Sequence, residues 1–188
     1  MKNLSEEDKL CQLIALHAHR CNILGLPLKG ENEGTPERCA KADLDQFREI
    51  PLKFTTFENK GYDQLILKEN IPFSAMCSHH LYPYFGHCHI GYIPGKKVCG
   101  LSKLARMIQS FSQGAASQEW LTQEITNFLE KELEPAGVIV VMKARHTCES
   151  TRGVKNDHEE SHFTTSAVTG VFAKSETGAR SEFFNLIK

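Results

Sequence analysis

The spacing of apolar side chains predicts a helix near the start of the chain. Its buried face has a member every three or four residues: Leu10, Leu13, Ile14, His17 and Cys21. Ser5 stands just before this stretch and an acid follows three residues later, which is typical of a helix N-terminus. Glycines and a proline in residues 25–34 end the pattern, and Thr35 with Pro36 then begins a second helix.

The rest of the chain alternates between strand and helix patterns. Residues 54–73, 87–93 and 137–144 contain short β-branched and aromatic runs bounded by glycine, proline or other turn residues, which indicates strands. Two apolar stripes with helical spacing lie between the last two runs: Leu101, Leu104, Ala105, Ile108 and Phe111, then Leu121, Ile125, Phe128 and Leu129. A further strand over residues 163–172 and a short helix ending near Ile187 follow. This order of elements predicts an α+β fold.

Composition narrows the class of protein. A length of 188 residues suits one domain. With 22 Lys+Arg against 23 Asp+Glu, the chain has no basic surplus for nucleic acid, and no apolar stretch approaches the ~18–20 residues of a membrane span. The first residues are acidic and polar, unlike a signal peptide, so we expect a cytoplasmic protein. Seven cysteines without a disulfide-scaffold spacing favour free thiols and metal ligands.

The densest group of metal-binding residue types is Cys77-Ser78-His79-His80. The Cys-x-x-His spacing brings a thiolate and an imidazole within reach of one ion, a usual arrangement for zinc. His146 and Cys148 form a second pair at the end of a strong strand, where alternation places them on one side. Three protein ligands would leave a fourth position for water, as in catalytic zinc sites. The alternative is that both cysteines are ordinary buried thiols.

A second histidine pair competes for the same role. In His87-Cys88-His89, a strand would direct the two imidazoles to one side and the thiol to the other. The pair could chelate a metal or simply be partly exposed side chains on a sheet.

Several cations could bind a triphosphate. Lys103 and Arg106 lie three residues apart on the first central helix, beside Ser102 near its start, where backbone donors would add to the site. The other candidates are Arg38 and Lys41 on the second helix and Arg152 shortly after Cys148. Each could equally belong to a solvated surface.

Gln118 and Glu119 open the second central helix. A carboxylate next to an amide matches the donor-rich edge of guanine, whose N1–H and 2-amino group face one way. Alternatively, Glu119 is an acid favoured at a helix start by the helix dipole.

Together these segments resemble the GTP cyclohydrolase I family. The matches are residues 35–38 with Lys41, 77–81, 100–111, 118–119 with 121–122, 146–148 with 152–154, and 164–166. They follow the family's order and spacing from Thr35 to Ile187. The resemblance implies the tunnelling fold, an antiparallel sheet with two central helices on one face. Residues 1–34 would be an N-terminal helical arm and residues 35–188 the catalytic domain.

The resemblance implies a zinc-dependent hydrolase that converts GTP and water to 7,8-dihydroneopterin triphosphate and formate. The guanine imidazole ring opens at C8, and an Amadori rearrangement and ring closure follow. Cys77, His80 and Cys148 would bind Zn²⁺, which activates the attacking water. His79 and His146 would transfer protons, with His146 protonating N7.

The remaining implied roles concern the substrate and the assembly. Ser102 would assist on the ribose side, and Glu119 with Gln118 would read the guanine. The triphosphate contacts would be Lys103, Arg106 and Arg152, with Arg38 and Lys41 supplied by a neighbouring subunit. The implied assembly is a homodecamer with active sites between subunits.

The sequence departs from the family pattern near the proposed site. Ser78 replaces a usual glutamate, residues 114–117 are small and neutral, and Trp120 replaces a usual arginine. These departures keep two alternatives open. One is the same fold acting on a deoxy or modified guanosine triphosphate, and the other is a non-catalytic, zinc-stabilised nucleotide-binding homologue.

Overall fold

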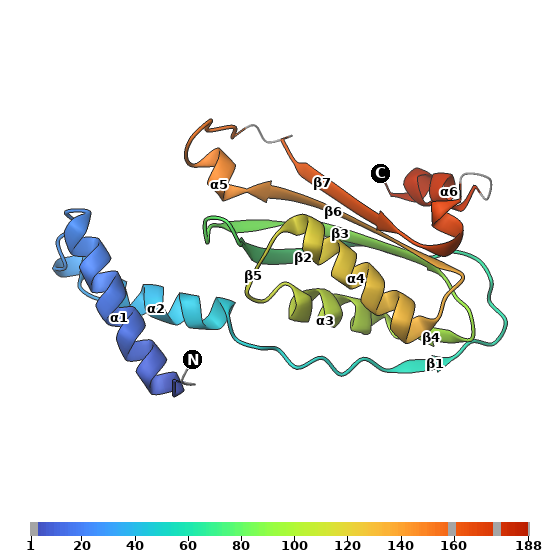
Figure 1. Cartoon of the computed structure of the whole chain (residues 1–188), viewed down its shortest axis with the longest axis horizontal. Coiled ribbons are helices and arrows are strands. Elements are labelled where there is room, and N and C mark those ends of the chain that lie inside the picture. Colours follow the sequence, from blue (N-terminus) through green and yellow to red (C-terminus); the bar gives the residue numbers. More distant parts are fainter. Residues whose placement is uncertain (1–3, 158–160, 175–177, 188) are drawn as a thin grey trace. The chain divides into compact units, whose positions relative to one another are not determined.

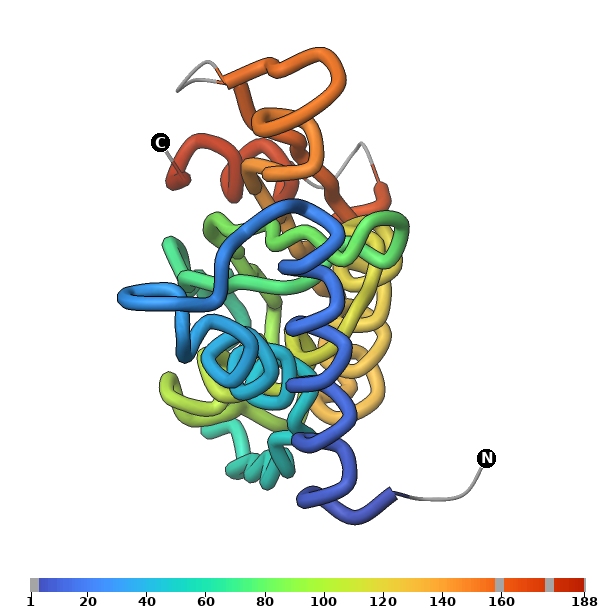
Figure 2. Tube along the Cα trace, turned by 90° about the vertical axis from the view of Figure 1, so that its left-hand side faces the viewer, coloured from blue at the N-terminus to red at the C-terminus, as the bar shows by residue number. Residues whose placement is uncertain are grey.

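The computed structural model describes residues 4–157, 161–174 and 178–187, in two compact units over residues 1–48 and 49–188. The first unit contains helices α1 (Glu6–Ile23) and α2 (Thr35–Gln46), with the 3-10 turn η1 (Gly30–Asn32) between them. Figure 2 shows α1 along its length. The Ser5 hydroxyl accepts a hydrogen bond from the Asp8 N–H, which confirms the predicted cap.

The two helices of the first unit pack on each other. His17 Nε2 lies 2.8 Å from Asp43 Oδ2, and Cys21 is buried. Because α2 packs against α1, the unit extends to Arg48, beyond the predicted arm boundary after residue 34. The assignment of residues 35–188 as the catalytic domain stays a prediction.

The second unit is built on a five-stranded sheet of order β5-β2-β3-β6-β7. The long strands are β2 (Ile66–Cys77), β3 (Pro83–Ile93) and β6 (Gly137–His146), followed by β7 (Phe163–Val168), each antiparallel to its neighbour. The two-residue strand β5 (Ala115–Ala116) pairs with β2 in parallel. A separate ribbon joins β1 (Thr56–Glu58) to β4 (Lys97–Cys99). This arrangement confirms the predicted α+β class.

Helices cover both faces of the sheet, as Figure 1 shows. Helices α3 (Leu101–Phe111) and α4 (Gln118–Leu133) pack on one face, where Leu104, Ile108 and Leu129 are completely buried. The segments η2 (Gly170–Ala173) and α6 (Ala179–Leu186) pack on the other face through Phe172 and Phe183. Side chains alternate along β6, so the one strand contributes to both cores.

The predicted strand over residues 163–172 is shorter than expected. β7 ends at Val168, and η2 follows from Gly170. Gly170 has φ +52°, and a Cβ at this position would lie 2.0 Å from the Ala136 carbonyl oxygen. This close approach of two backbones turns the chain out of the sheet.

Gly86 should be essential for the pairing of β3 with β6. A Cβ at this position would lie 1.9 Å from the Lys143 carbonyl oxygen and 2.7 Å from the Ala144 Cα. We therefore expect Gly86→Ala to lower the free energy of unfolding by about 1–3 kcal/mol, since the backbones must move apart. Urea denaturation measures this change. Gly100→Ala is the control, because its added methyl would meet the Phe57 ring at 3.8 Å and the Lys103 side chain at 3.9 Å, both ordinary van der Waals contacts. An equal loss in both variants would contradict the explanation.

Candidate active site

The candidate site lies at one edge of the large sheet. β2 and β6 are both antiparallel to β3, so they run in the same direction and end at the same edge. Cys77 ends β2 and His146 ends β6, and the N-terminus of α4 meets them there. A cavity of about 230 Å³ is lined by Cys77, His79, His80, Ser117, Gln118, Glu119, His146, Cys148, Glu149 and Phe163.

Two thiols and an imidazole meet in this cavity. One ligand atom each from Cys77, His146 and Cys148 lies within 4.8 Å of the other two. Burial raises the pKa of the Cys148 thiol, and the Cys77 thiol beside it raises that pKa further. Sulfur and imidazole nitrogen are the donors that zinc prefers, so these residues fit a zinc ion. The structure thus brings the predicted His146/Cys148 pair to Cys77.

The other two predicted histidines lie in the turn after β2. His79 Nδ1 is 3.7 Å from Cys77 Sγ. His80 Nε2 accepts a hydrogen bond from the Arg152 guanidinium, so the structure joins a predicted zinc ligand to a predicted phosphate contact. The roles of His79, His80 and Arg152 stay predictions.

His146 is held on three sides. Its ring stacks on Tyr84, with centroids 4.4 Å apart and planes 3° from parallel, and Phe163 meets it edge-on at 5.6 Å. Its Nε2 lies 2.9 Å from Gln118 Oε1. Burial lowers the pKa of His146, and the charge of Glu119 opposes that effect. Sequence reasoning missed Tyr84, whose partnership follows from the register that pairs it with His146.

The N-terminus of α4 carries the predicted guanine-reading pair. The Ser117 hydroxyl accepts a hydrogen bond from the Trp120 N–H and caps the helix. This places Glu119 in the first turn as an exposed carboxylate at the cavity, while Gln118 is buried. Glu149 on α5 (Thr147–Ser150) adds a second carboxylate that sequence reasoning did not single out.

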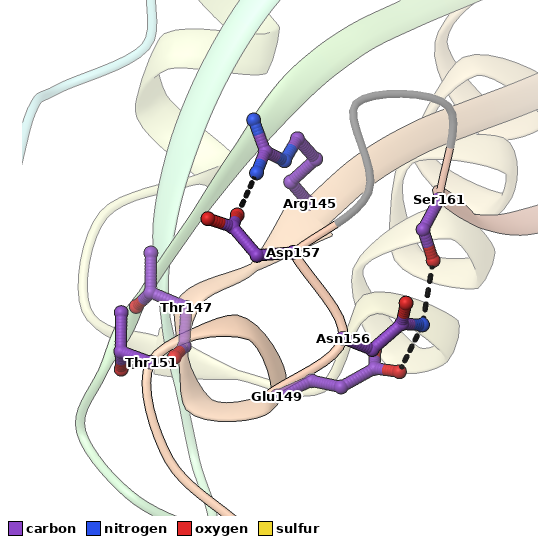
Figure 3. Close-up of polar contacts among 7 residues, drawn as sticks. All are labelled: Arg145, Thr147, Glu149, Thr151, Asn156, Asp157 and Ser161. Carbon is purple, nitrogen blue, oxygen red and sulfur yellow. Dashed lines mark hydrogen bonds and ion pairs between the residues drawn. The ribbon is translucent and has the colours of Figure 1, made fainter. Parts of the chain in front are cut away.

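Polar contacts hold the short helix that carries Cys148 (Figure 3). The Thr147 hydroxyl donates to the Pro83 carbonyl oxygen at 2.6 Å, which ties α5 to β3. Asn156 Nδ2 donates to Glu149 Oε1 at 2.9 Å and to Ser161 Oγ at 2.8 Å. Arg145 pairs with Asp157 across the same loop. These bonds fix the thiol relative to the sheet edge.

The predicted phosphate contacts other than Arg152 lie on α3 and in the first unit. Ser102 and Arg106 are exposed on α3, and Lys103 Nζ donates to the Lys53 carbonyl oxygen at 3.0 Å. No α3 residue is among the described residues that line the cavity. In the first unit, Arg38 donates to the Glu31 carbonyl oxygen and Lys41 pairs with Glu37 at 2.6 Å.

In the competing segment His87-Cys88-His89, the structure buries Cys88 and His89. Cys88 is fully buried in the core, and burial raises the pKa of its thiol. His89 is also buried, and its Nδ1 accepts a hydrogen bond from the Asn70 N–H at the bulge in β2. Within the part of the chain that the structure describes, only Cys77, His146 and Cys148 form a group of three or more suited to a metal.

The fold and the site together define an α+β protein with a thiol and imidazole centre at the sheet edge. A sequence model of the family described as GTP cyclohydrolase I matches residues 27–188. The chain belongs to the GTP cyclohydrolase I family. Family membership and the antiparallel sheet with two central helices confirm the predicted tunnelling fold.

Curated relatives agree with this assignment over most of their length. A GTP cyclohydrolase 1 of Aquifex aeolicus is 46% identical over 189 residues, which covers 97% of each chain. One from Sulfurihydrogenibium sp. is 47% identical over 156 residues, or 81% of each chain. One from Parabacteroides distasonis is 38% identical and covers 97% of this chain and 96% of the relative.

None of the described helices is both long and apolar enough to cross a membrane.

Proposed function

We propose that this chain is a zinc-dependent enzyme that converts GTP and water to 7,8-dihydroneopterin triphosphate and formate. The observation that carries the proposal is the cavity where two thiols, three imidazoles and the Glu119 carboxylate meet. Hydrolytic opening of a purine ring needs an activated water, a proton donor and a group that orients the base, and this cavity contains residue types for each.

The thiols of Cys77 and Cys148 would hold the zinc, with His80 as the third ligand. His80 stands three residues after Cys77, and its bond to Arg152 is an exposed contact that a metal could replace. His146 is the alternative third ligand, since it already lies with both thiols. Zinc lowers the pKa of a bound water to ~7, which supplies hydroxide at neutral pH.

The protein's own side chains would orient the base and move protons. The Glu119 carboxylate would accept hydrogen bonds from guanine N1–H and the 2-amino group. His146 would give a proton to N7 as the C8–N bond breaks, and His79 would serve the second proton transfer. Tyr84 and Phe163 pack against the His146 ring and cover part of it.

We propose that the site is shared between subunits of a homodecamer. Arg152 would bind the triphosphate from the same chain as the zinc. The cavity lining of the same chain does not include the candidate residues on α3, which are Ser102, Lys103 and Arg106. We therefore assign these three residues, together with Arg38 and Lys41, to the site of a neighbouring copy. The free cysteines suit a reducing compartment, and we propose a cytoplasmic location.

The test is to incubate purified, zinc-loaded protein with GTP. We expect formate release together with a product that becomes a fluorescent pterin on oxidation. Nucleotide binding without formate, at one zinc per chain, would instead support the non-catalytic alternative. Equal turnover of GTP and dGTP would indicate a relaxed ribose site, whereas turnover of dGTP or a modified nucleotide alone would support the altered substrate.

A further inference from the structure

The Gln118 side chain is buried, and its hydrogen-bond partners determine which way its amide group faces. It is 1% exposed, and its Nε2 lies 3.0 Å from the Met142 carbonyl oxygen and 3.1 Å from that of Phe163. Carbonyl oxygens only accept hydrogen bonds, so the amide NH₂ must face them. The opposite amide orientation would set the Gln118 oxygen against two acceptors.

The same direction follows from two neighbouring threonines. The Thr122 hydroxyl donates to the main-chain carbonyl oxygen of Gln118 at 2.7 Å, which uses its one hydrogen. In the 2.6 Å contact between Thr122 and Thr165, the hydrogen must therefore come from Thr165. Thr165 Oγ1 is then left to accept from Gln118 Nε2 at 3.1 Å. Each bond of this chain has one allowed polarity.

The remaining atom of the amide determines the state of His146. Gln118 Oε1 can only accept, and it lies 2.9 Å from His146 Nε2. His146 Nε2 must therefore carry a hydrogen. When the imidazole is neutral, its lone pair is on Nδ1, and stacking on Tyr84 keeps the ring in this plane.

We propose that Gln118 is a positioning residue that fixes the tautomer of His146 and leaves Nδ1 as its only nitrogen for proton exchange or ligation in the cavity. This differs from the predicted role of Gln118 in reading guanine, because its amide nitrogen and oxygen already bind protein groups. The consequence for catalysis rests on the proposed function, but the tautomer does not.

Solid-state NMR of the full-length protein labelled with ¹⁵N-histidine tests the tautomer without any turnover. We expect a protonated Nε2 and an unprotonated Nδ1 for His146 at pH 8, with the signal assigned by its loss in His146→Gln. A protonated Nδ1 with a bare Nε2 would overturn the proposal. Failure of GTP turnover would leave this result unchanged, so the two proposals fail separately.

Kinetics then separate positioning from base reading. Gln118→Met removes the acceptor, so we expect mixed His146 tautomers and a kcat about 10–100-fold lower, with the KM for GTP nearly unchanged. Thr165→Val is the second variant, to be used if Gln118→Met fails to fold. It removes one hydrogen-bond partner of the Gln118 amide without touching His146, and we expect the same changes in tautomer and kcat, but smaller. A raised KM with unchanged kcat and an unchanged tautomer in either variant would show that Gln118 does not position His146.

Discussion

Replacing Cys148 by serine should remove both the zinc and the turnover of GTP. The thiol is one of two sulfur donors within 4.8 Å of the other cluster atoms, and it lies on the short helix α5 that directly follows β6. Loss of the metal would remove several kcal/mol of transition-state stabilisation, so we expect kcat to fall by about 10³-fold or more. Zinc per chain, from elemental analysis, and formate release are the two measurements.

A matched thiol elsewhere provides the control for Cys148. Cys11 is an exposed cysteine on α1, and Cys11→Ser should keep wild-type zinc content and turnover. If Cys148→Ser kept one zinc per chain and normal formate release, the proposed metal centre would be wrong. A loss of folding would be seen by circular dichroism, and Cys77→Ser would then test the second sulfur.

Replacing His146 by glutamine should slow the chemistry while sparing the metal. Its imidazole is positioned by Gln118, Tyr84 and Phe163, and removing a general acid costs about 10²–10⁴-fold in kcat. His80→Gln should behave differently, since we propose that it supplies the third zinc ligand. We therefore expect zinc loss in His80→Gln and zinc retention in His146→Gln.

The reverse outcome has a definite meaning. Zinc retained in His80→Gln and lost in His146→Gln would identify Cys77, His146 and Cys148 as the ligand set, as their proximity allows. His87 is an exposed histidine on β3 outside the cavity, and His87→Gln should change neither zinc content nor kcat.

The local elements were largely predictable because their signals lie within a few residues. Apolar spacing predicts α3 and α4, and the cap at Ser5 predicts the start of α1. The end of β7 was not predictable in this way. It depends on the approach of Gly170 to the Ala136 backbone, a contact between distant parts of the chain.

The sequence by itself determined the family, the α+β class and the donor types of the site. It could not determine which donors meet. Cys77 reaches Cys148 only because β2 and β6 run parallel on either side of β3, and Gln118 reaches His146 only because α4 packs against β6. Such contacts depend on sheet register and helix packing rather than on local propensity, so only the tertiary structure decided them.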